Sequence, residues 1–212
     1  MNAESDNVKN FLFVPKNDNY MQDFYKLCFE CTKQDLTVLL ITRKSCKLLP
    51  LLSKEQINKD QLKKCIIMHF ERIEDIVKKL LELHDWTLLP VLIVIDLNSF
   101  LEDYAWQSRA ATLELIETST KSLTALQQIC LCIATLFNYM SSVEQRLLAF
   151  KLESAGQKMA HSIVLLGEHK DIVSKTQLEL LINLYFYDGT AFDDFDEMKS
   201  GIASTWRKNV KQ

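Results

Sequence analysis

Hydrophobic positions in the first half of the chain alternate between two patterns. Short unbroken apolar runs predict buried strands, and apolar residues at three- and four-residue spacing predict amphipathic helices. The expected strands lie at residues 11–14, 36–42, 64–70 and 89–97. The expected helical stripes are Met21, Phe24, Leu27, Cys28 and Cys31, and then Ile73, Ile76, Val77, Leu80 and Leu81. Strands that alternate with helices are typical of a parallel α/β sheet.

The strand at 89–97 has the strongest signal, because it is apolar at every position from Val91 to Ile95 and ends on Asp96. An uninterrupted apolar strand is covered on both faces, as central strands of parallel sheets are. This pattern therefore predicts a sheet with helices on both sides.

The second half reads as richer in strands. A helix is expected over residues 105–128, a strand over 129–136, and a helix over 143–154 behind an N-cap at Ser141 and Ser142. Further strands are expected over 161–166, 178–187 and 202–206. The predicted fold is α/β, with a mostly parallel sheet flanked by helices and antiparallel C-terminal edge strands. The predicted organisation is a disordered leader at 1–10, one domain at 11–206 and a basic tail at 207–212.

Glycine is scarce and unevenly placed. The 212 residues contain 4 glycines, at Gly156, Gly167, Gly189 and Gly201, whereas average usage of ~7% would place about 11 before residue 156. Glycine-rich phosphate loops need residues without a Cβ, because the backbone must approach the phosphates closely. Both the dinucleotide loop and an intact P-loop are therefore excluded from the first three quarters of the chain.

The segment after the first strand occupies the place of a phosphate loop. Laying the eight-residue P-loop pattern on VPKNDNYM puts Val14 and Asn19 at the glycine positions, Tyr20 at the lysine and Met21 at the Ser/Thr that holds magnesium. The variable positions between the two glycine positions are Pro15, Lys16, Asn17 and Asp18. Every position with a chemical task is replaced, so we interpret this segment as a degenerate loop without nucleotide chemistry.

Asp96 ends a buried strand, which is the Walker-B arrangement in which an acid holds magnesium. An acid at the end of any buried strand also caps the following turn. Without a working phosphate loop, Asp96 has no magnesium–nucleotide to hold, so we favour the capping interpretation. No catalytic residue, metal or cofactor is expected.

Cysteine and histidine spacing does not favour a metal site. Cys28 and Cys31 form one C-x-x-C on a helix, while Cys130 and Cys132 form C-x-C in the strand expected at 129–136. The two pairs meet only if that helix packs beside that strand, and core thiols are the favoured interpretation. The four histidines are isolated from one another and read as surface or strand-end residues.

The distribution of charge is weak evidence for nucleic-acid binding. The formal net charge is −3, so the whole molecule lacks the basic character of nucleic-acid-binding domains. Local candidates for backbone contacts are Arg146, Lys151 and Lys158, together with Arg207 and Lys208 beside Trp206. Residues 122–143 form a charge-free stretch long enough to span a bilayer. Its polar residues, and the helix-to-strand change expected within it, argue against a membrane-spanning helix. No membrane partner is therefore expected.

Three segments carry a resemblance to a known family. LTVLLITRKSCKLLP (36–50), LKKCIIMHFERIEDI (62–76) and LPVLIVIDLNSFLED (89–103) resemble the RecA-like core of eukaryotic recombinase paralogs. They are most like the small subunit that accompanies a SWIM-domain zinc protein in the metazoan Shu complex. The resemblance covers about residues 11–137 and carries the family's Walker-B aspartate over to Asp96. It implies a SWIM-domain partner, a RecA-type recombinase partner, support of filaments on single-stranded DNA in homologous recombination repair, and a nuclear location, with the cytoplasm as a further compartment.

Three hypotheses remain open. The first is a non-catalytic RecA-like adaptor, the second a weak ATPase that uses Lys16 and Asp96, and the third an unrelated α/β scaffold or regulatory subunit. A RecA-like core is expected to place the Asp96 strand directly beside the strand that leads into the degenerate loop. Any other placement favours the scaffold.

Overall fold

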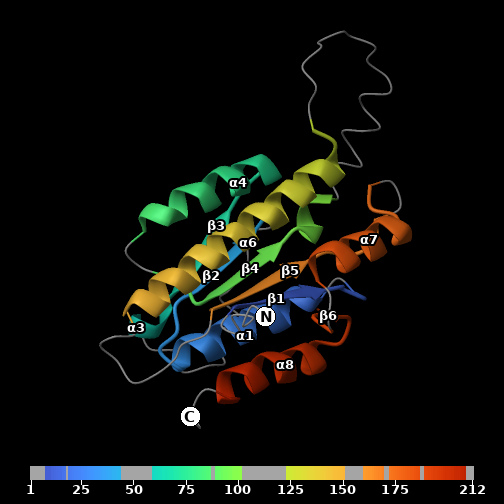
Figure 1. Ribbon diagram of the computed structural model, residues 1–212. Helices are drawn as coiled ribbons and strands as arrows, with labels where there is room; N and C mark the ends of the chain where they lie inside the picture. Colours follow the sequence, from blue (N-terminus) through green and yellow to red (C-terminus); the bar gives the residue numbers. More distant parts are fainter. Residues whose placement is uncertain are drawn as a thin grey trace, which may run out of the picture.

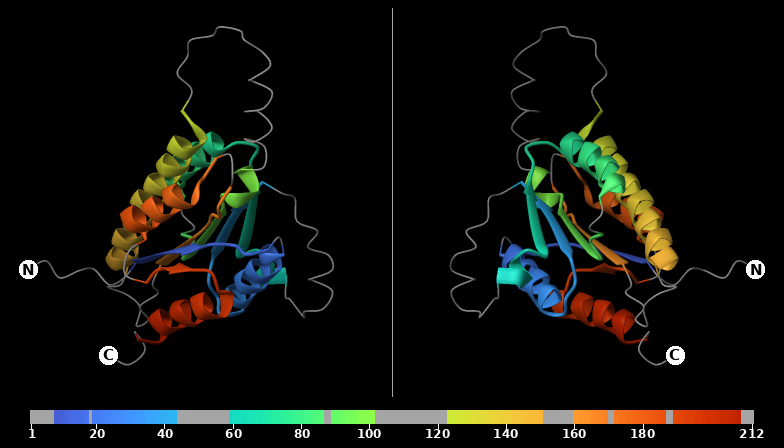
Figure 2. Two further views of the ribbon diagram at one scale, coloured as in Figure 1. Left: turned by 90° about the vertical axis from the view of Figure 1, so that its right-hand side faces the viewer. Right: turned by 90° about the vertical axis from the view of Figure 1, so that its left-hand side faces the viewer.

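The structure is a computed structural model that describes residues 8–17, 19–43, 59–86, 89–101, 123–150, 160–169, 172–186 and 189–208. The side chains of residues 8, 147–150 and 205–208 lie outside that description. The described chain forms one six-stranded sheet with helices packed on both faces (Figures 1 and 2).

All strand pairs of this sheet are parallel, and their order is β3-β2-β4-β5-β1-β6. The strands are β1 (Val8–Phe13), β2 (Val38–Thr42), β3 (Cys65–His69), β4 (Leu92–Asp96), β5 (Ala160–Leu165) and β6 (Ala191–Phe192). Because the strands are parallel, their carboxyl ends lie along one edge of the sheet. Loops and helix N-termini that follow the strands therefore gather there.

The helices divide between the two faces of the sheet (Figure 2). One face carries α4 (Ile73–Glu82), the short 3-10 helix η1 (Leu83–Asp85), α6 (Ala125–Phe150) and α7 (Lys175–Tyr185). The other carries α1 (Tyr20–Lys33), α3 (Lys59–Leu62) and α8 (Phe195–Lys208). Each face has its own hydrophobic cluster, so the sheet separates two cores.

Strand β4 contributes to both cores, as its unbroken apolar run predicts. Leu92 and Val94 pack in the cluster beneath α1 and α8, whereas Ile93 and Ile95 pack in the cluster beneath α4 and α6. All four side chains are fully buried. Burial of each such side chain contributes about 1.5–3 kcal/mol, which makes β4 a main stabilising element of the sheet.

The prediction of parallel strands flanked by helices is confirmed through residue 101. Strands β1 to β4 and helices α1 and α4 form where the hydrophobic patterns place them, and β5 matches the strand expected at 161–166. Strand β1 begins at Val8. Residues 8–10, which the sequence assigned to a leader, thus belong to the sheet. Most of the helix expected at 105–128 lies outside the described residues.

The strand predicted over 129–136 is wrong, because these residues lie within α6. Buried side chains recur at Ile129, Cys132, Ile133, Leu136, Tyr139, Met140 and Val143, which is the period of a helix. The eight-residue window that reads as an apolar strand is too short to separate the two periods. Ser141 and Ser142 also lie within this single helix and do not begin a new one.

The strands predicted at 178–187 and 202–206 are wrong as well, since residues 178–185 lie in α7 and residues 202–206 lie in α8. Helix α7 begins with a capping box, in which Ser174 Oγ accepts from the Gln177 amide and Gln177 Oε1 accepts from the Ser174 amide. In α8, Phe195, Met198 and Ile202 recur at helical spacing and face the core. The described residues therefore form no antiparallel C-terminal edge strands, and the edge strand β6 is parallel to β1.

The expected adjacency of the β1 and β4 strands is also wrong. Strand β5 lies between them, paired with β1 on one side and β4 on the other. Taken alone, this placement favours the unrelated scaffold by the criterion stated above. The coarser statement holds: a parallel six-stranded sheet flanked by helices is consistent with a RecA-like α/β core.

Helix α6 is long and apolar enough, over residues 125–146, to cross a membrane by length and composition. No helix-to-strand change interrupts it, so that part of the sequence argument is wrong. One face of the helix nevertheless lies in the core against α4 and β5, as in core helices of folded domains.

Candidate functional site

Asp96 is the centre of a buried polar cluster at the carboxyl edge of the sheet. Its side chain is 1% exposed. Tyr20 donates its hydroxyl to Asp96 Oδ1 at 2.9 Å, the Ser99 amide donates to the same oxygen at 3.2 Å, and the Thr42 hydroxyl donates to Oδ2 at 3.3 Å. The carboxylate is thus held by three uncharged donors.

Each donor comes from a different strand connection. Tyr20 is the first residue of α1, Thr42 is the last residue of β2, and Ser99 lies in the helical turn that follows β4. Ser99 also donates its hydroxyl to the Asp96 carbonyl at 2.9 Å, which closes that turn. Parallel strands bring such connections together at one edge, where α/β proteins bind ligands.

Asn98 extends the cluster toward β5. Its amide nitrogen donates to the Tyr20 hydroxyl at 3.4 Å, and its Oδ1 accepts from the Gly167 amide at 3.2 Å. A Cβ at position 167 would stand 3.2 Å from that same Oδ1, so a glycine fits this close approach. The cluster therefore joins the ends of β2, β4 and β5 to the start of α1.

Burial raises the pKa of the Asp96 carboxyl above its ordinary value, because the charged form loses its hydration. The hydrogen bonds from Tyr20, Ser99 and Thr42 oppose this rise. This arrangement is typical of a structural carboxyl group whose hydrogen-bonding capacity is met by other groups of the protein. The capping interpretation of Asp96 is in keeping with this geometry.

Residues 14–21, interpreted from the sequence as a degenerate phosphate loop, make packing contacts and internal hydrogen bonds. Tyr20 is bound to Asp96, Met21 packs against the core beneath α1, and Val14 packs against the core beneath α6. Asn19 precedes α1 without a side-chain capping bond, and its amide donates to Asn17 Oδ1 at 3.0 Å. Pro15 is half-buried, while Asp18 lies outside the described residues.

Lys16 does not replace the missing loop lysine. Its ammonium forms an ion pair with Asp193 at 2.8 Å, and both side chains are largely exposed. Asp193 follows β6, on the opposite side of β1 from β5 and β4. The ion pair therefore directs Lys16 away from Asp96, and the pairing that the ATPase hypothesis needs does not form.

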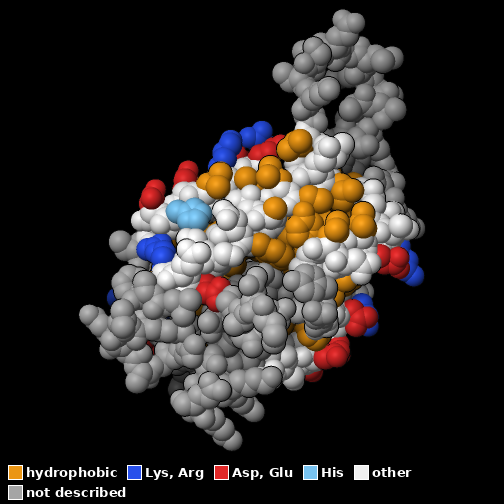
Figure 3. Space-filling model, viewed as in Figure 1, with side chains coloured by type: hydrophobic (Ala, Val, Ile, Leu, Met, Phe, Trp, Pro, Cys, Tyr) orange, Lys and Arg blue, Asp and Glu red, His pale blue; other side chains and the backbone are white. Residues whose placement is uncertain are grey.

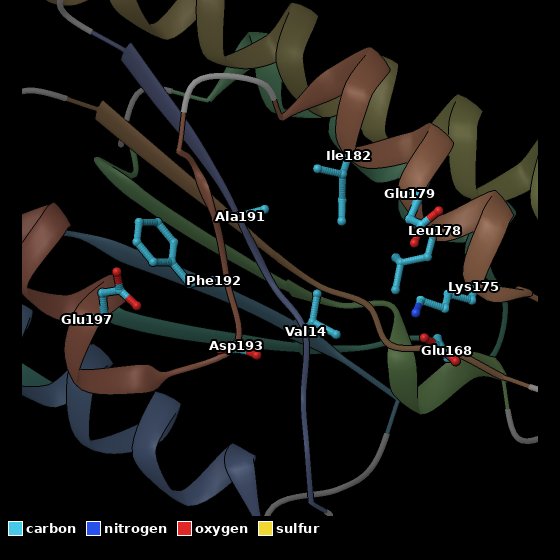
Figure 4. Close-up of a pocket in the computed structure, with 10 residues that line it drawn as sticks. All are labelled: Val14, Glu168, Lys175, Leu178, Glu179, Ile182, Ala191, Phe192, Asp193 and Glu197. Carbon is cyan, nitrogen blue, oxygen red and sulfur yellow. The ribbon is translucent and has the colours of Figure 1, made fainter.

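A cavity of about 320 Å³ opens at the same edge of the sheet but on the β6 side of β1 (Figure 4). Its walls come from Val14 after β1, Glu168 after β5, the inner face of α7, strand β6 and the start of α8. Figure 4 shows the side chains of Val14, Leu178, Ile182 and Ala191 around its centre. Nothing in the sequence pattern indicated this cavity, because its walls come from five separate segments.

The candidate nucleic-acid residues are scattered or lie outside the described side chains. Arg146 is engaged within the fold, since its guanidinium donates to the carbonyls of His84 at 3.1 Å and Trp86 at 2.8 Å. Lys151 and Lys158 lie outside the described residues. Arg207 and Lys208 end α8, and only their backbone is described.

The two cysteine pairs lie on opposite faces of the sheet. Cys28 and Cys31 are in the core beneath α1, whereas Cys130 and Cys132 belong to α6 on the other face. Burial raises the pKa of Cys31 and of Cys132 to about 12 and that of Cys28 well above its usual value. These thiols are therefore buried core residues held in the protonated form.

His161 is a further buried titratable group, and the sequence analysis, which expected surface or strand-end histidines, did not predict its burial. It lies in β5, is fully buried, and its Nδ1 is 2.8 Å from the Ala160 carbonyl. Burial lowers the pKa of His161 to about 4. The available signal was its position at the start of a strand whose later residues, Ile163 to Leu165, are all apolar.

The sequence matches no known protein-family profile and is not significantly similar to any curated protein.

Proposed function

We propose that this chain is a non-catalytic recombinase-paralog subunit that pairs with a SWIM-domain zinc protein. In this role it supports assembly of a RecA-type recombinase filament on single-stranded DNA during homologous recombination repair. Support comes from the resemblance of residues 36–50, 62–76 and 89–103, and from an α/β sheet of the kind that such a core requires. The proposal places the protein in the nucleus.

The Tyr20–Asp96 hydrogen bond carries the non-catalytic part. In a working P-loop domain, the residue at position 20 is a lysine on the phosphates and the acid at position 96 holds magnesium. Here the two positions satisfy each other directly at 2.9 Å. A magnesium–nucleotide would need to break this bond and expose a buried carboxylate, while the Cβ atoms of Val14 and Asn19 still obstruct the phosphates.

The interposed strand β5 does not weaken this geometry. The chemistry of a nucleotide site requires the loop after β1 to meet the end of β4, and it does not require the two strands to pair. Tyr20 reaches Asp96 across the end of β5, with Asn98 and Gly167 bridging the same gap. The loop after β1 therefore meets the end of β4 although the two strands do not pair.

Each of the two alternative hypotheses is still supported by one observation. The scaffold hypothesis is favoured by the placement of β5 between β1 and β4. The ATPase hypothesis retains only the position of Asp96, since Lys16 is paired with Asp193. DNA contact by this chain rests on Lys151, Lys158, Arg207 and Lys208, because Arg146 is bound to backbone carbonyls.

Nucleotide binding and partner binding are tested in separate experiments. Titration of the purified chain with a fluorescent ATP analogue and magnesium is expected to give no saturable binding up to millimolar concentration. Saturable binding that is lost in Asp96→Ala would contradict the non-catalytic part. Co-expression with a SWIM-domain protein and a recombinase, followed by size-exclusion chromatography, is expected to give a co-eluting complex. Failure of both proteins to co-elute contradicts the partner assignment and favours the scaffold.

A further inference from the structure

The cavity beside β6 combines an apolar centre with a charged rim. Val14, Leu178, Ile182 and Ala191 surround its middle, and Phe192 adds an aromatic wall. Its volume of about 320 Å³ lies at the lower end of the range for ligand pockets. The space suits one or two side chains of a peptide better than a nucleotide.

Carboxylates dominate the rim. Among the residues that the structure describes, Glu168, Glu179, Asp193 and Glu197 line the cavity together with one ammonium group, that of Lys175. Asp193 is paired with Lys16, so the described carboxylates outnumber the described ammonium groups four to two even when Lys16 is included. The other four rim residues form no ion pair with another described residue, which leaves their charges available to a ligand.

The placement of the charges is also informative. Glu168 and Lys175 lie at one end of the cavity in Figure 4, while Asp193 and Glu197 lie toward the other, with the aliphatic side chains between them. A ligand with an apolar centre and a positive charge on either side would match this order. A phosphate-bearing ligand would meet several like charges at short range and is disfavoured.

We propose that this cavity binds a short segment of a partner protein in which an aliphatic side chain is flanked by lysines or arginines. The aliphatic group enters between Leu178 and Ile182, and the basic groups meet the carboxylates of the rim. The N-terminal residues 1–7 of this chain do not have this chemistry, since they contain Glu4 and Asp6 and no lysine or arginine. The site does not depend on the proposed function, because it lies away from Asp96 and requires no SWIM-domain protein.

The experiment uses three peptide probes on the full chain with isotope-labelled Val, Leu and Ile methyl groups. The probes are acetyl-Gly-Lys-Leu-Lys-Gly-amide and the matched peptides in which both lysines become glutamate or the leucine becomes serine. We expect the Lys-Leu-Lys peptide to shift the methyl signals of Val14, Leu178 and Ile182. The serine peptide should bind at least fivefold more weakly, and the glutamate peptide should not bind. Raising the salt from 50 to 300 mM should weaken binding, as ion screening requires.

Substitutions in the rim should change the affinity for the Lys-Leu-Lys peptide in opposite directions. Glu168→Gln and Glu179→Gln should each weaken binding about two- to fivefold, as partly exposed charge pairs do, whereas Lys175→Gln should strengthen it. All three residues are exposed, so the variants are expected to fold, and thermal unfolding verifies this.

Three outcomes overturn the proposal. The first is equal binding of the lysine and glutamate peptides, and the second is weaker binding in Lys175→Gln. The third is self-association of the wild-type chain that Lys211→Glu abolishes, because this result would identify the basic tail of a second copy as the occupant.

Discussion

The hydroxyl of Tyr20 donates a 2.9 Å hydrogen bond to Oδ1 of Asp96, although the two residues are 76 positions apart in the sequence. In the P-loop alignment proposed above, these are the positions of the phosphate-binding lysine and the magnesium-binding acid. On that proposal, the bond replaces two ligand-binding positions by one internal contact, and the site is stabilised without a nucleotide.

Tyr20→Phe tests how much this hydrogen bond contributes to the free energy of unfolding. The variant removes one donor from a buried carboxylate, so we expect the free energy of unfolding to fall by about 1–3 kcal/mol. Urea unfolding monitored by circular dichroism measures the change. Tyr185→Phe is the matched control, because its hydroxyl has no hydrogen bond with a described residue, and it should cost less than about 0.5 kcal/mol. Equal losses in the two variants would show that the Tyr20 hydroxyl contributes nothing specific.

Tyr20→Lys restores the charge of the P-loop lysine and nothing else. Val14 and Asn19 still carry side chains where the loop needs glycines, and Met21 still lacks a hydroxyl for magnesium. We expect this variant to bind a fluorescent ATP analogue no better than the wild type, even at millimolar magnesium. Saturable binding in Tyr20→Lys alone would mean that the lysine was the single missing element.

Asp96→Asn tests the buried carboxyl through its pH dependence. The pKa of Asp96 is raised in the folded protein, so the folded state binds the proton more tightly than the unfolded state. The native state is therefore relatively destabilised as pH rises through the folded pKa. Asparagine does not ionise, and its oxygen can still accept from Tyr20 and Ser99.

We therefore expect Asp96→Asn to gain stability relative to the wild type between pH 4 and pH 7, as measured by thermal unfolding across that range. Asp96→Ala, which loses every bond, should be destabilised throughout. A loss of stability in Asp96→Asn that grows toward pH 7 would indicate that the carboxylate is stabilised by a positive charge in the native state.

His161 gives a pH dependence of opposite sign. Its folded pKa of about 4 lies below its ordinary value of 6.5, so protons favour the unfolded state as the pH falls between these values. Integrated over that interval, the loss amounts to about 3 kcal/mol. Urea unfolding from pH 7 to pH 4.5 should show a shallower loss of stability in His161→Leu than in the wild type. Parallel curves for the two proteins would mean that His161 becomes protonated without opening the fold.

The sequence predicted secondary structure correctly where the hydrophobic pattern was compatible with only one type of element. Apolar runs placed β1 to β4, and Asp96 at the end of β4 was visible as a candidate for a polar site. The run at 129–136 was misread because cysteine, isoleucine and leucine suit a buried strand or a buried helix equally. The S-x-x-Q capping box at Ser174 and Gln177 is the local sequence signal for the start of α7.

The contacts of the site required three-dimensional information. The pairing of Tyr20 with Asp96 depends on the placement of α1 over the sheet edge, which local periodicity does not encode. The strand order depends on long-range pairing as well, and the expected adjacency of β1 and β4 failed for this reason. The cavity beside β6 depends on α7 and α8, and the sequence analysis predicted strands within both segments.

Arg146 separates a structural role from a nucleic-acid role. Its guanidinium donates to the carbonyls of His84, within η1, and Trp86, just beyond η1, and thereby connects α6 to the segment that leads into β4. Arg146→Gln removes both charge-assisted bonds, and we expect a loss of about 2–3 kcal/mol in the free energy of unfolding. Arg146→Lys should recover only part of it, because an ammonium cannot reproduce the two-pronged geometry.

Binding to single-stranded DNA should respond differently to these residues. In fluorescence anisotropy with a labelled oligothymidine, Arg146→Gln is expected to leave the affinity unchanged at a temperature where the variant is folded. Lys151→Gln and Lys158→Gln are the comparison, since a direct backbone contact by either lysine would weaken binding and reduce its salt dependence. A loss of DNA affinity in Arg146→Gln without a loss of stability would reverse the assignment, because it would show that the guanidinium exchanges the two carbonyls for a phosphate when DNA is present.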